Sequence, residues 1–215
     1  MEPIPERERN AGRTRDAVLD AAERLFAERG YESTSLTDVG AAAGVSRGTP
    51  GYFFRSKELL YRAVLERCLE RVRAAVRSGR ERALASAELP EIVLAGAVGE
   101  YFDFISANPH FVRLLEWEAL SGGNHLQTLP PHLEAAQEAL GAIVSELALE
   151  PSDQAEAEQL LVSMLALSWF HVVHAPTVLR ALGVDATTEA YRQERRQHVV
   201  NLVVQGVRGR LEAGK

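Results

Sequence analysis

Residues 34–60 constrain the fold more than any other part of the chain, and they read TSLTDVGAAAGVSRGTPGYFFRSKELL. Ser35 followed by Asp38 has nearly the spacing and chemistry of a capping box, which begins a helix. Gly44 permits a sharp turn after that short helix, and Ser46 is placed to cap the next one. Two short helices joined by a glycine-containing turn are typical of a helix-turn-helix motif.

Helical patterns on both sides extend this motif into a small domain. Thr14 is placed to cap a first helix, and Gly30 can end that helix with a positive φ. The apolar residues between them recur at the spacing of one buried stripe: Val18, Ala21, Ala22, Leu25 and Phe26. Ser56 is placed to cap a long helix over about 57–77. We therefore predict a helix-turn-helix domain at 14–60.

Residues 1–13 are charged, contain two prolines and show no periodicity, so we predict a flexible N-terminal arm. Arg7, Arg9 and Arg13 of this arm could reach into a minor groove of DNA. A solvated tail is the simpler interpretation, and we favour it.

The rest of the chain is also predicted to be helical, because Ala, Leu, Glu and Arg dominate and alternating strand patterns are nearly absent. Breaks at Pro and Gly delimit the expected helices, which lie at about 90–106, 109–120, 131–149, 153–173, 176–182 and 186–211. The predicted fold class is all-α, with a larger helical domain at 61–215 after the helix-turn-helix domain.

Charge and composition limit the possible partners and compartments. Residues 1–82 contain 16 Lys and Arg against 13 Asp and Glu, while the remainder contains 8 against 17. The front of the chain can therefore attract phosphate although the whole chain carries a net charge of −6. Cys68 is the only cysteine, no apolar run reaches about 18 residues, and the start lacks a signal-peptide core. We expect a cytoplasmic protein with no membrane partner.

Four segments, AAERLFAERGY, TSLTDV, AAGVS and FRSKELL, occur at spacings that resemble the DNA-binding domain of the tetracycline-repressor (TetR) family. The resemblance covers roughly Thr14 to Leu60, and the later helices follow the family's layout only in plan. It implies a homodimeric transcriptional regulator, usually a repressor, that binds a palindromic operator in double-stranded DNA. It also implies that residues 61–215 bind a small-molecule effector and dimerise. The effector must bind the released conformation better than the DNA-bound one.

Pro50-Gly51 departs from the family, which typically has leucine and tyrosine at these positions. The resemblance assigns position 50 to the core, and positions 51 and 53 to phosphate contacts. Gly51 and Phe53 lack the usual hydroxyl groups, and Tyr52 can replace one of them. A DNA-binding domain that no longer binds, in a chain that remains a small-molecule sensor, is the alternative.

Two starts are possible for the helix that carries Pro50. If Ser46 is the cap, Pro50 is the fourth helical residue and one hydrogen bond at the end of the helix is lost. If Thr49 is the cap, the helix begins at Pro50 itself. We favour Ser46, and in both cases the helix is short and its first turn is loosened.

The resemblance and the residue chemistry together give a set of DNA contacts. Arg47, Thr49 and Tyr52 are candidates for base edges, and Arg47 suits guanine. Contacts to the DNA backbone are expected beside them and at the amide-rich start of the helix after Ser35. The full predicted set is Thr34, Ser35, Arg47, Gly48, Thr49, Tyr52, Phe53 and Lys57.

Aromatic side chains concentrate in the middle helices and suggest an effector pocket there. The predicted ligand-binding residues are Tyr101, Phe102, Phe104, Phe111, Trp117, Trp169, Phe170, His171 and His174. Apolar walls with few polar groups predict a hydrophobic or aromatic effector. Aromatic residues at helical spacing are nevertheless more often plain core.

His171 and His174 stand three residues apart on a predicted helix, which can place two imidazoles toward one metal. No cysteine or third carboxylate stands nearby in sequence, so a hydrogen-bonded structural histidine is the favoured interpretation. A helical metal-dependent enzyme is the remote alternative. No catalytic motif, cofactor or metal site is predicted.

The final helix carries a broad apolar stripe with a small residue in it, which suits close helix–helix contact. Together with the helix at 153–173, the resemblance makes it a four-helix dimer interface. The predicted interface residues are Leu161, Leu165, His198, Val199, Leu202, Val203, Gly206 and Val207. The alternative is core packing within one chain.

Overall fold

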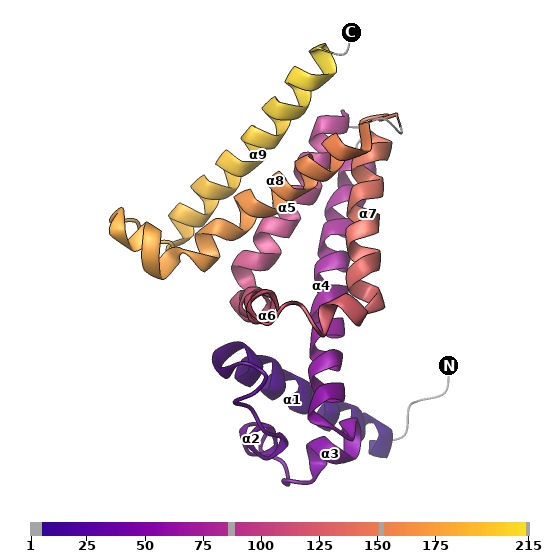
Figure 1. Ribbon diagram of the computed structural model, residues 1–215, viewed down its shortest axis with the longest axis vertical. Helices are drawn as coiled ribbons and strands as arrows, with labels where there is room; N and C mark the ends of the chain where they lie inside the picture. Colours follow the sequence, from indigo (N-terminus) through magenta and orange to yellow (C-terminus); the bar gives the residue numbers. More distant parts are fainter. Residues whose placement is uncertain (1–5, 86–88, 151–152, 214–215) are drawn as a thin grey trace. The chain divides into compact units, whose positions relative to one another are not determined.

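The computed structural model describes residues 6–85, 89–150 and 153–213, and every regular element in these ranges is helical, which confirms the all-α prediction (Figure 1). In chain order the elements are α1 (Glu6–Arg29), α2 (Leu36–Ala42), α3 (Thr49–Phe54), α4 (Lys57–Ala85), α5 (Pro90–Ala107), α6 (Pro109–Leu120), the 3-10 turn η1 (Leu126–Thr128), α7 (Pro130–Glu146), α8 (Gln154–Val173), the π-helical turn η3 (Ala175–Leu179) and α9 (Glu189–Ala213). None of the described helices is long and apolar enough to cross a membrane.

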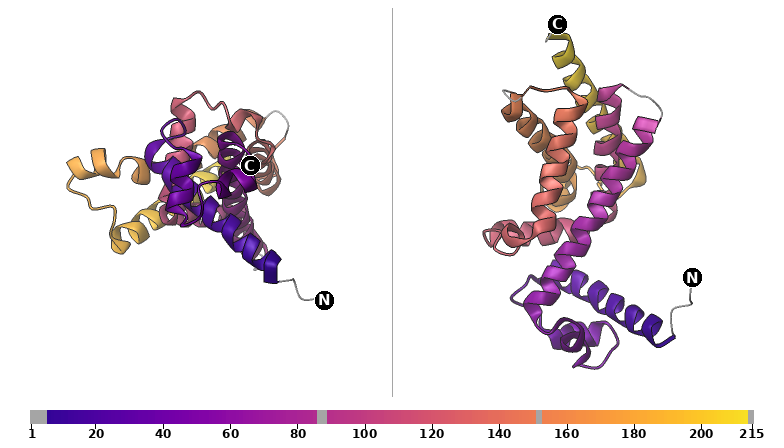
Figure 2. Two further views of the ribbon diagram at one scale, coloured as in Figure 1. Left: turned by 90° about the horizontal axis from the view of Figure 1, so that it is seen from below. Right: turned by 90° about the vertical axis from the view of Figure 1, so that its right-hand side faces the viewer.

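The described residues form two compact units. The first, called the head below, comprises residues 6–68 and 113–129, and the second, called the body, comprises the other described residues. Helix α4 is one continuous helix that contributes residues to both units (Figure 2). The sequence predicted a boundary near residue 60 and did not indicate that residues 113–129 pack with the N-terminal helices.

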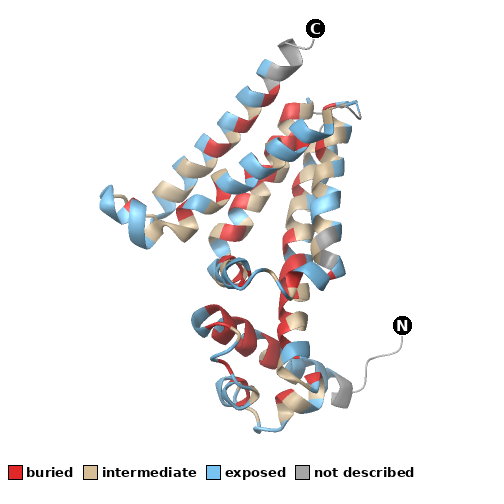
Figure 3. Cartoon of the chain, viewed as in Figure 1, coloured by how far each residue is buried: buried red, intermediate tan, exposed pale blue. Residues whose placement is uncertain are grey.

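The head is built on the buried stripe of α1, which faces apolar residues of α4 (Figure 3). Val18, Ala22 and Phe26 of α1 are at most 1% exposed, and Tyr61 and Val64 of α4 are equally buried. The rings of Phe26 and Tyr61 meet edge to face with centroids 4.8 Å apart. The helical spacing in the sequence therefore identified the correct core stripe of α1.

Helix α1 begins at Glu6, so the prediction of a flexible arm is wrong for residues 6–13. Glu, Arg and Ala in this segment are strong helix formers and continue the helix outward. The Thr14 hydroxyl donates to the Asn10 carbonyl within the helix, at 2.9 Å, instead of capping it. Arg9 and Arg13 are exposed on this first part of α1, whereas residues 1–5 lie outside the described part.

The body has its core where α5 packs against α8 and α9 and where α7 covers α8. Its buried residues come from all four helices: Leu94, Val98, Phe102, Ile143, Leu147, Ala157, Met164, Val199, Val203 and Val207. Ion pairs link the second half of α4 to α7, with Arg73 bonded to Glu138 at 3.0 Å and to Glu134 at 3.2 Å. Helices α5 and α9 pack against each other and form the pocket described below.

Two predicted helices of the body differ from the structure. The helix expected at 176–182 is a π-helical turn, because Pro176 stands in its first turn. Helix α7 ends at Glu146, three residues before the predicted 149, with Ala148 at a positive φ of 48°.

Candidate nucleic-acid interface and effector pocket

The start of α2 is closed by a capping box, as the sequence predicts. The Ser35 hydroxyl oxygen accepts from the Asp38 N–H at 3.1 Å, and the Asp38 carboxylate accepts from the Ser35 N–H at 3.1 Å. The Ser35 hydroxyl also donates to this carboxylate at 2.6 Å, and these hydrogen bonds lower the pKa of Asp38. Because a carboxylate already occupies the amide-rich start of α2, this end is less suited to a phosphate than predicted.

The turn between α2 and α3 depends on two glycines. Gly44 has a φ of 68°, and the next residue, Val45, donates its N–H to the Gly40 carbonyl at 3.0 Å. A Cβ on Gly40 would lie 3.2 Å from the Ser46 carbonyl oxygen, so the glycine allows the two backbones to approach closely. The sequence signal GAAAGVS was therefore interpreted correctly as a sharp turn.

Helix α3 begins at Thr49 with Gly48 as its N-cap residue, so neither predicted start is correct. The Ser46 and Thr49 hydroxyls hydrogen-bond each other at 2.7 Å, which holds the turn before the helix. Pro50 is the second helical residue, and its missing N–H would have had no acceptor within the helix. The first such bond runs from the Tyr52 N–H to the Gly48 carbonyl at 2.9 Å. Pro50 therefore costs α3 no hydrogen bond.

The turn and α3 present an arginine and an aromatic side chain to solvent. Arg47 and Gly48 are exposed and Thr49 is partly exposed, just before Pro50 turns into the core. Tyr52 is 82% exposed, and its ring meets the edge of the Phe53 ring at a centroid distance of 5.2 Å. Five of the predicted DNA contacts, Arg47, Gly48, Thr49, Tyr52 and Phe53, thus lie together within seven residues.

Two predicted DNA contacts, Thr34 and Lys57, make contacts within the head. Thr34 is 2% exposed, and its hydroxyl donates to the Gly30 carbonyl at 3.0 Å, so this side chain is corrected to a part of the core. The Lys57 ammonium donates to the Tyr31 and Glu32 carbonyls at 3.1 and 3.4 Å and lies 4.2 Å from the Tyr31 ring centroid. Lys57 therefore holds the connection between α1 and α2 against the start of α4.

A buried carboxylate joins residues 113–129 to the rest of the head, and no sequence pattern predicted it. Glu118 is 2% exposed. One of its oxygens accepts from the Tyr61 hydroxyl and lies within hydrogen-bond distance of His125 Nδ1, both at 2.9 Å. The other accepts the N–H groups of His125 and Leu126 at 3.1 and 3.2 Å. Every part of this carboxylate is therefore hydrogen-bonded.

Trp117 belongs to this same junction, so its assignment to an effector pocket in the body is wrong. Its Nε1 donates to the Ala27 carbonyl at 3.2 Å. Its ring covers Gly30, where a Cβ would lie 3.3 Å from two ring carbons. Burial of the indole face over this glycine is what places Trp117 in the head.

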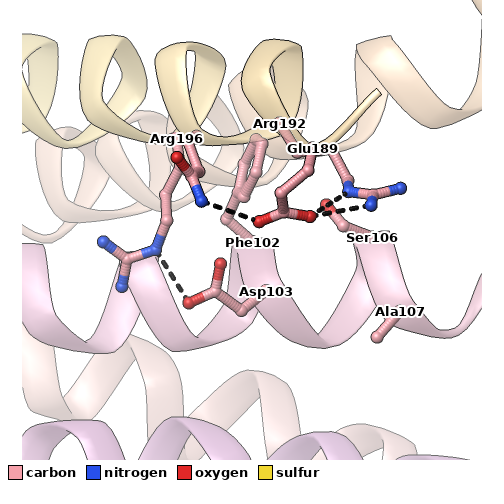
Figure 4. Close-up of a pocket in the computed structure, with 8 residues that line it drawn as sticks. Phe102, Asp103, Ser106, Ala107, Glu189, Arg192 and Arg196 are labelled. Carbon is pink, nitrogen blue, oxygen red and sulfur yellow. Dashed lines mark hydrogen bonds and ion pairs between the residues drawn. The ribbon is translucent and has the colours of Figure 1, made fainter. Parts of the chain in front are cut away.

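A pocket of the body lies between α5 and α9 and has a volume of about 450 Å³ (Figure 4). Its lining residues are Phe102, Asp103, Ser106, Ala107, Glu189, Arg192, Gln193 and Arg196. Phe102 is the only one of them that the sequence predicted as a ligand contact. The predicted apolar walls are therefore wrong for this pocket, because four of its eight lining side chains are charged.

Among the other predicted aromatic residues Phe111 is 3% exposed and Tyr101, Phe104 and Trp169 are partly buried, and none of these four lines the pocket. The Tyr101 hydroxyl accepts from Trp169 Nε1, and burial raises the pKa of Tyr101. Phe104 and Phe111 meet edge to face with centroids 5.5 Å apart. Phe170 is 43% exposed and its ring lies 4.5 Å from that of His174, away from the pocket lining.

His171 lies directly behind the pocket. It is 3% exposed, stacks on the Phe102 ring at 4.5 Å, and its Nε2 lies 3.0 Å from the Ser106 hydroxyl. Burial lowers the pKa of His171 to about 4, so the ring is neutral near pH 7. Among the described residues no group of three or more His, Cys, Asp and Glu side chains could hold a metal ion.

The predicted dimer stripe of α9 divides into two rows. Val199, Val203 and Val207 are at most 4% exposed in the core of the body, so the alternative of intramolecular packing is correct for them. His198, Leu202 and Gly206 form a neighbouring exposed row, at the spacing of four residues that one helix face requires. On α8, Leu165 is 38% exposed and Leu161 is partly buried.

Comparison with known proteins gives matches at both ends of the chain. The family model of tetR-family bacterial regulatory proteins matches residues 18–64. The model of the tetracyclin repressor-like C-terminal domain matches residues 90–203, which is more than half of the chain.

Individual relatives agree with the family models. The regulator RutR of Escherichia coli K12 is 27% identical over 210 residues, 95% of each chain, and the repressor NicS of Pseudomonas putida is 23% identical, over 94% of this chain and 96% of NicS. The repressor ComR of Escherichia coli K12 is 48% identical over 60 residues, 28% of this chain and 29% of ComR.

A solved structure, SCO4942 of Streptomyces coelicolor, shares the fold with a TM-score of 0.68 and 23% identity over 88% of this chain and 96% of that one. The fatty acid degradation regulator FadR of Bacillus halodurans has a TM-score of 0.60 with 18% identity, over 86% and 97% of the two chains. The chain belongs to the TetR family of transcriptional regulators, and it is a regulator and not an enzyme.

Proposed function

We propose that this protein is a homodimeric, ligand-responsive repressor that reads a palindromic operator with the turn and α3 of its head. The observation that carries the proposal is the group Arg47, Gly48, Thr49, Tyr52 and Phe53, all exposed or partly exposed on the turn and on a regular helix in spite of Pro50 and Gly51. A helix-turn-helix places this part of its second helix in the major groove.

Residue chemistry gives each contact a role. The Arg47 guanidinium suits the two acceptors of guanine, and Tyr52 can pack against a base or donate its hydroxyl to a phosphate. Phe53 supplies apolar contact to sugars in place of a phosphate hydrogen bond. The head thus makes fewer phosphate contacts through side chains than the family pattern implies, so the base contacts contribute a larger share of its affinity.

A dimer is supported by the exposed row on α9. Leu202 is 40% exposed next to Gly206, and on α8 Val162 and Leu165 are 58% and 38% exposed. A Cβ on Gly206 would meet nothing within 4 Å in the chain itself, so a partner's backbone can approach this point. A symmetric pair of helices from each chain would bury these apolar side chains.

The test of DNA reading is selection of bound sequences from random duplex DNA, with affinity then measured at two salt concentrations. We expect an inverted repeat, and Arg47→Ala should weaken binding by about 1–3 kcal/mol and relax base preference in each half-site. Arg180→Ala is the matched control, because that arginine is exposed in the body. If Arg47→Ala leaves affinity and base preference unchanged, the assignment of base contacts is wrong.

The alternative of a sensor with an inactive head is decided by the same experiment. Weak binding that enriches no sequence and disappears with salt would contradict the repressor and favour the sensor, because nonspecific binding depends on phosphate contacts.

Dimerisation has its own test in Gly206→Leu, measured by sedimentation velocity. The substitution should shift the protein toward monomer if the exposed row of α9 is the interface. Gly141→Leu is the matched control, since a Cβ on this exposed α7 glycine also meets nothing within 4 Å. An unchanged dimer in Gly206→Leu would contradict the proposed interface.

A further inference from the structure

Two arginines lie at the end of α3 without a hydrogen-bonding partner among the described residues. Helices α1 and α3 pack against each other in the head (Figure 1). The Arg15 guanidinium of α1 lies over the ring of Phe54, the last residue of α3, with Cζ 5.0 Å from the ring centroid. Arg55 follows directly, and both arginines are exposed. Within the described part of the chain neither guanidinium forms a hydrogen bond or an ion pair, so both can bind another molecule.

Arg55 has a backbone conformation that arginine rarely adopts. Its φ is 64° and its ψ is −47°, and across it the Ser56 N–H donates to the Phe54 carbonyl at 2.7 Å. A three-residue turn with a positive φ at its centre is rare and strained, and glycine fits a positive φ best. The presence of arginine at this strained position therefore indicates a function for its side chain.

Positive charge gathers at this end of the helix-turn-helix. From Val39 to Lys57 the chain contains three cationic residues, Arg47, Arg55 and Lys57, and no acidic one. The Lys57 ammonium is bound to two carbonyl groups of the head, whereas Arg15 adds its charge at the end of α3. Two guanidinium groups at one helix end favour an anion there, and their planar donors suit phosphate oxygens.

The position of the two arginines relative to Arg47 fits the edge of a major groove. In the proposed function Arg47 contacts bases from the turn before α3, while Arg15 and Arg55 lie at the opposite end of that helix. The six residues of α3 are about 9 Å long, and the major groove is about 12 Å wide. With one end of α3 over the bases, long side chains at its other end can therefore reach the phosphates that border the groove.

We infer that Arg15 and Arg55 bind phosphates of the operator backbone beside the half-site that α3 reads. The inference rests on the proposed function, and it adds two contacts that the sequence did not predict. These contacts partly replace the hydroxyl groups that are missing at Gly51 and Phe53. They fix the position of the head on the duplex and carry no base preference of their own.

The test is binding of the full-length protein to its selected operator, measured by fluorescence anisotropy over a series of salt concentrations. Each phosphate contact contributes about 0.9 to the steepness of log affinity against log salt concentration. Arg15→Gln and Arg55→Gln should each reduce this steepness by about 0.9 per bound protomer. Each should weaken binding by about tenfold at low salt without changing base preference. An unchanged steepness, or a changed base preference, in either variant would overturn the assignment of that arginine.

Arg24→Gln is the matched control on α1. Arg24 is exposed, and because it follows Arg15 by nine residues it projects from the opposite face of the helix. Affinity and salt dependence should stay at the wild-type values in this variant, and an equal loss would contradict the site. Arg15→Lys keeps the charge and should retain most of the salt dependence, which separates a phosphate contact from packing on Phe54.

Arg55→Gly separates the side chain from the turn that it occupies. Glycine relieves the positive φ, so the melting temperature should rise while operator binding weakens. A side chain retained only for the turn would not give opposite changes in stability and affinity. Wild-type affinity and salt dependence in Arg55→Gly would contradict the inference for this residue.

Sequence selection is carried out on the same protein, so that the two proposals fail separately. If an operator is selected and the arginine variants keep the wild-type salt dependence, only this inference is wrong. If no operator is selected, the repressor proposal is wrong. The salt dependence of binding to random duplex DNA then decides whether the two arginines contact phosphates.

Discussion

The head and the body each bury a titratable side chain, but the two side chains differ in how completely they are hydrogen-bonded. In the head, Glu118 has a hydrogen-bond partner on each oxygen, including two backbone N–H groups. In the body, His171 has a partner on Nε2, whereas its Nδ1 is buried without a hydrogen bond of full geometry. A buried group with a partner on every polar atom stabilises the fold, whereas a buried polar atom without a partner costs free energy.

The largest effect is expected from Glu118→Ala. In the wild type the Glu118 carboxylate accepts hydrogen bonds from the Tyr61 hydroxyl and from two backbone N–H groups. The substitution leaves these three donors buried and without partners. We expect unfolding of the head to become easier by about 3–5 kcal/mol, measured by urea denaturation. Glu118→Gln keeps the shape and an acceptor oxygen and should cost less. Equal losses in both variants would mean that the carboxylate is not what joins residues 113–129 to α4.

His171 should make stability depend on pH. Its pKa is about 4 in the fold and about 6.5 in the unfolded chain, so the unfolded chain binds the proton first. Its contribution is complete above pH about 6.5 and is lost as pH falls toward 4, to a total of roughly 3 kcal/mol. His171→Gln should remove this part of the acid sensitivity in thermal melts between these pH values, and His174→Gln should not. If the melting temperature of His171→Gln depends on pH as that of the wild type does, His171 is not the source of the acid sensitivity.

A smaller effect is expected where α3 carries its unusual glycine. Gly51 is partly exposed, and a Cβ there would meet only Leu36 Cδ1, at 4.0 Å. Gly51→Ala should therefore stabilise the head by about 0.5–1 kcal/mol through helix propensity. Gly40→Ala is the contrasting variant, because its Cβ would lie 3.2 Å from a carbonyl oxygen and should destabilise. Melting temperatures of the two variants moving in the same direction would contradict this reading of the turn.

The smallest effect on stability is expected at the end of α7, which can be compared with the end of α2 in the head. Helix α7 ends with the Leu149 N–H bonded to the Val144 carbonyl at 3.0 Å, the same pattern that Val45 and Gly40 form after α2. The head has Gly44 at the left-handed position, whereas the body has Ala148 with a φ of 48°. Ala148→Gly should raise the free energy of unfolding of the body by roughly 0.5 kcal/mol, read from chemical denaturation. A decrease would show that Ala148 is not strained.

The sequence predicted correctly those features that depend on residues close together along the chain. The capping box at Ser35, the turn at Gly44 and the stripe of α1 each follow from a few adjacent residues, and the structure has all three. The start of α3 was missed because the Ser46 and Thr49 hydroxyls hydrogen-bond each other, and Gly48, which has no side chain, is the N-cap residue.

Contacts between distant residues could not be predicted in this way. Nothing local in the sequence distinguishes Trp117 from the other aromatic residues, and its place is decided by Gly30 and the Ala27 carbonyl far away in the chain. The charged pocket was missed for the same reason, since Asp103 and Arg196, which form an ion pair in it, are 93 residues apart. The dimer residues, DNA contacts and ligand contacts stay predictions until the experiments above are done.

The head is assembled from two stretches of chain, and this has a consequence for how it is made. The second stretch ends at Leu129, about 60 residues after Cys68 closes the first. At roughly 5–20 residues per second, a ribosome completes the head some 3–12 s after its helix-turn-helix has emerged. During that interval Glu118 and Trp117 have not been synthesised. The Tyr61 hydroxyl and the Ala27 carbonyl therefore cannot form the hydrogen bonds that they make in the folded head. The helix-turn-helix is thus synthesised before residues 113–129, which complete its unit.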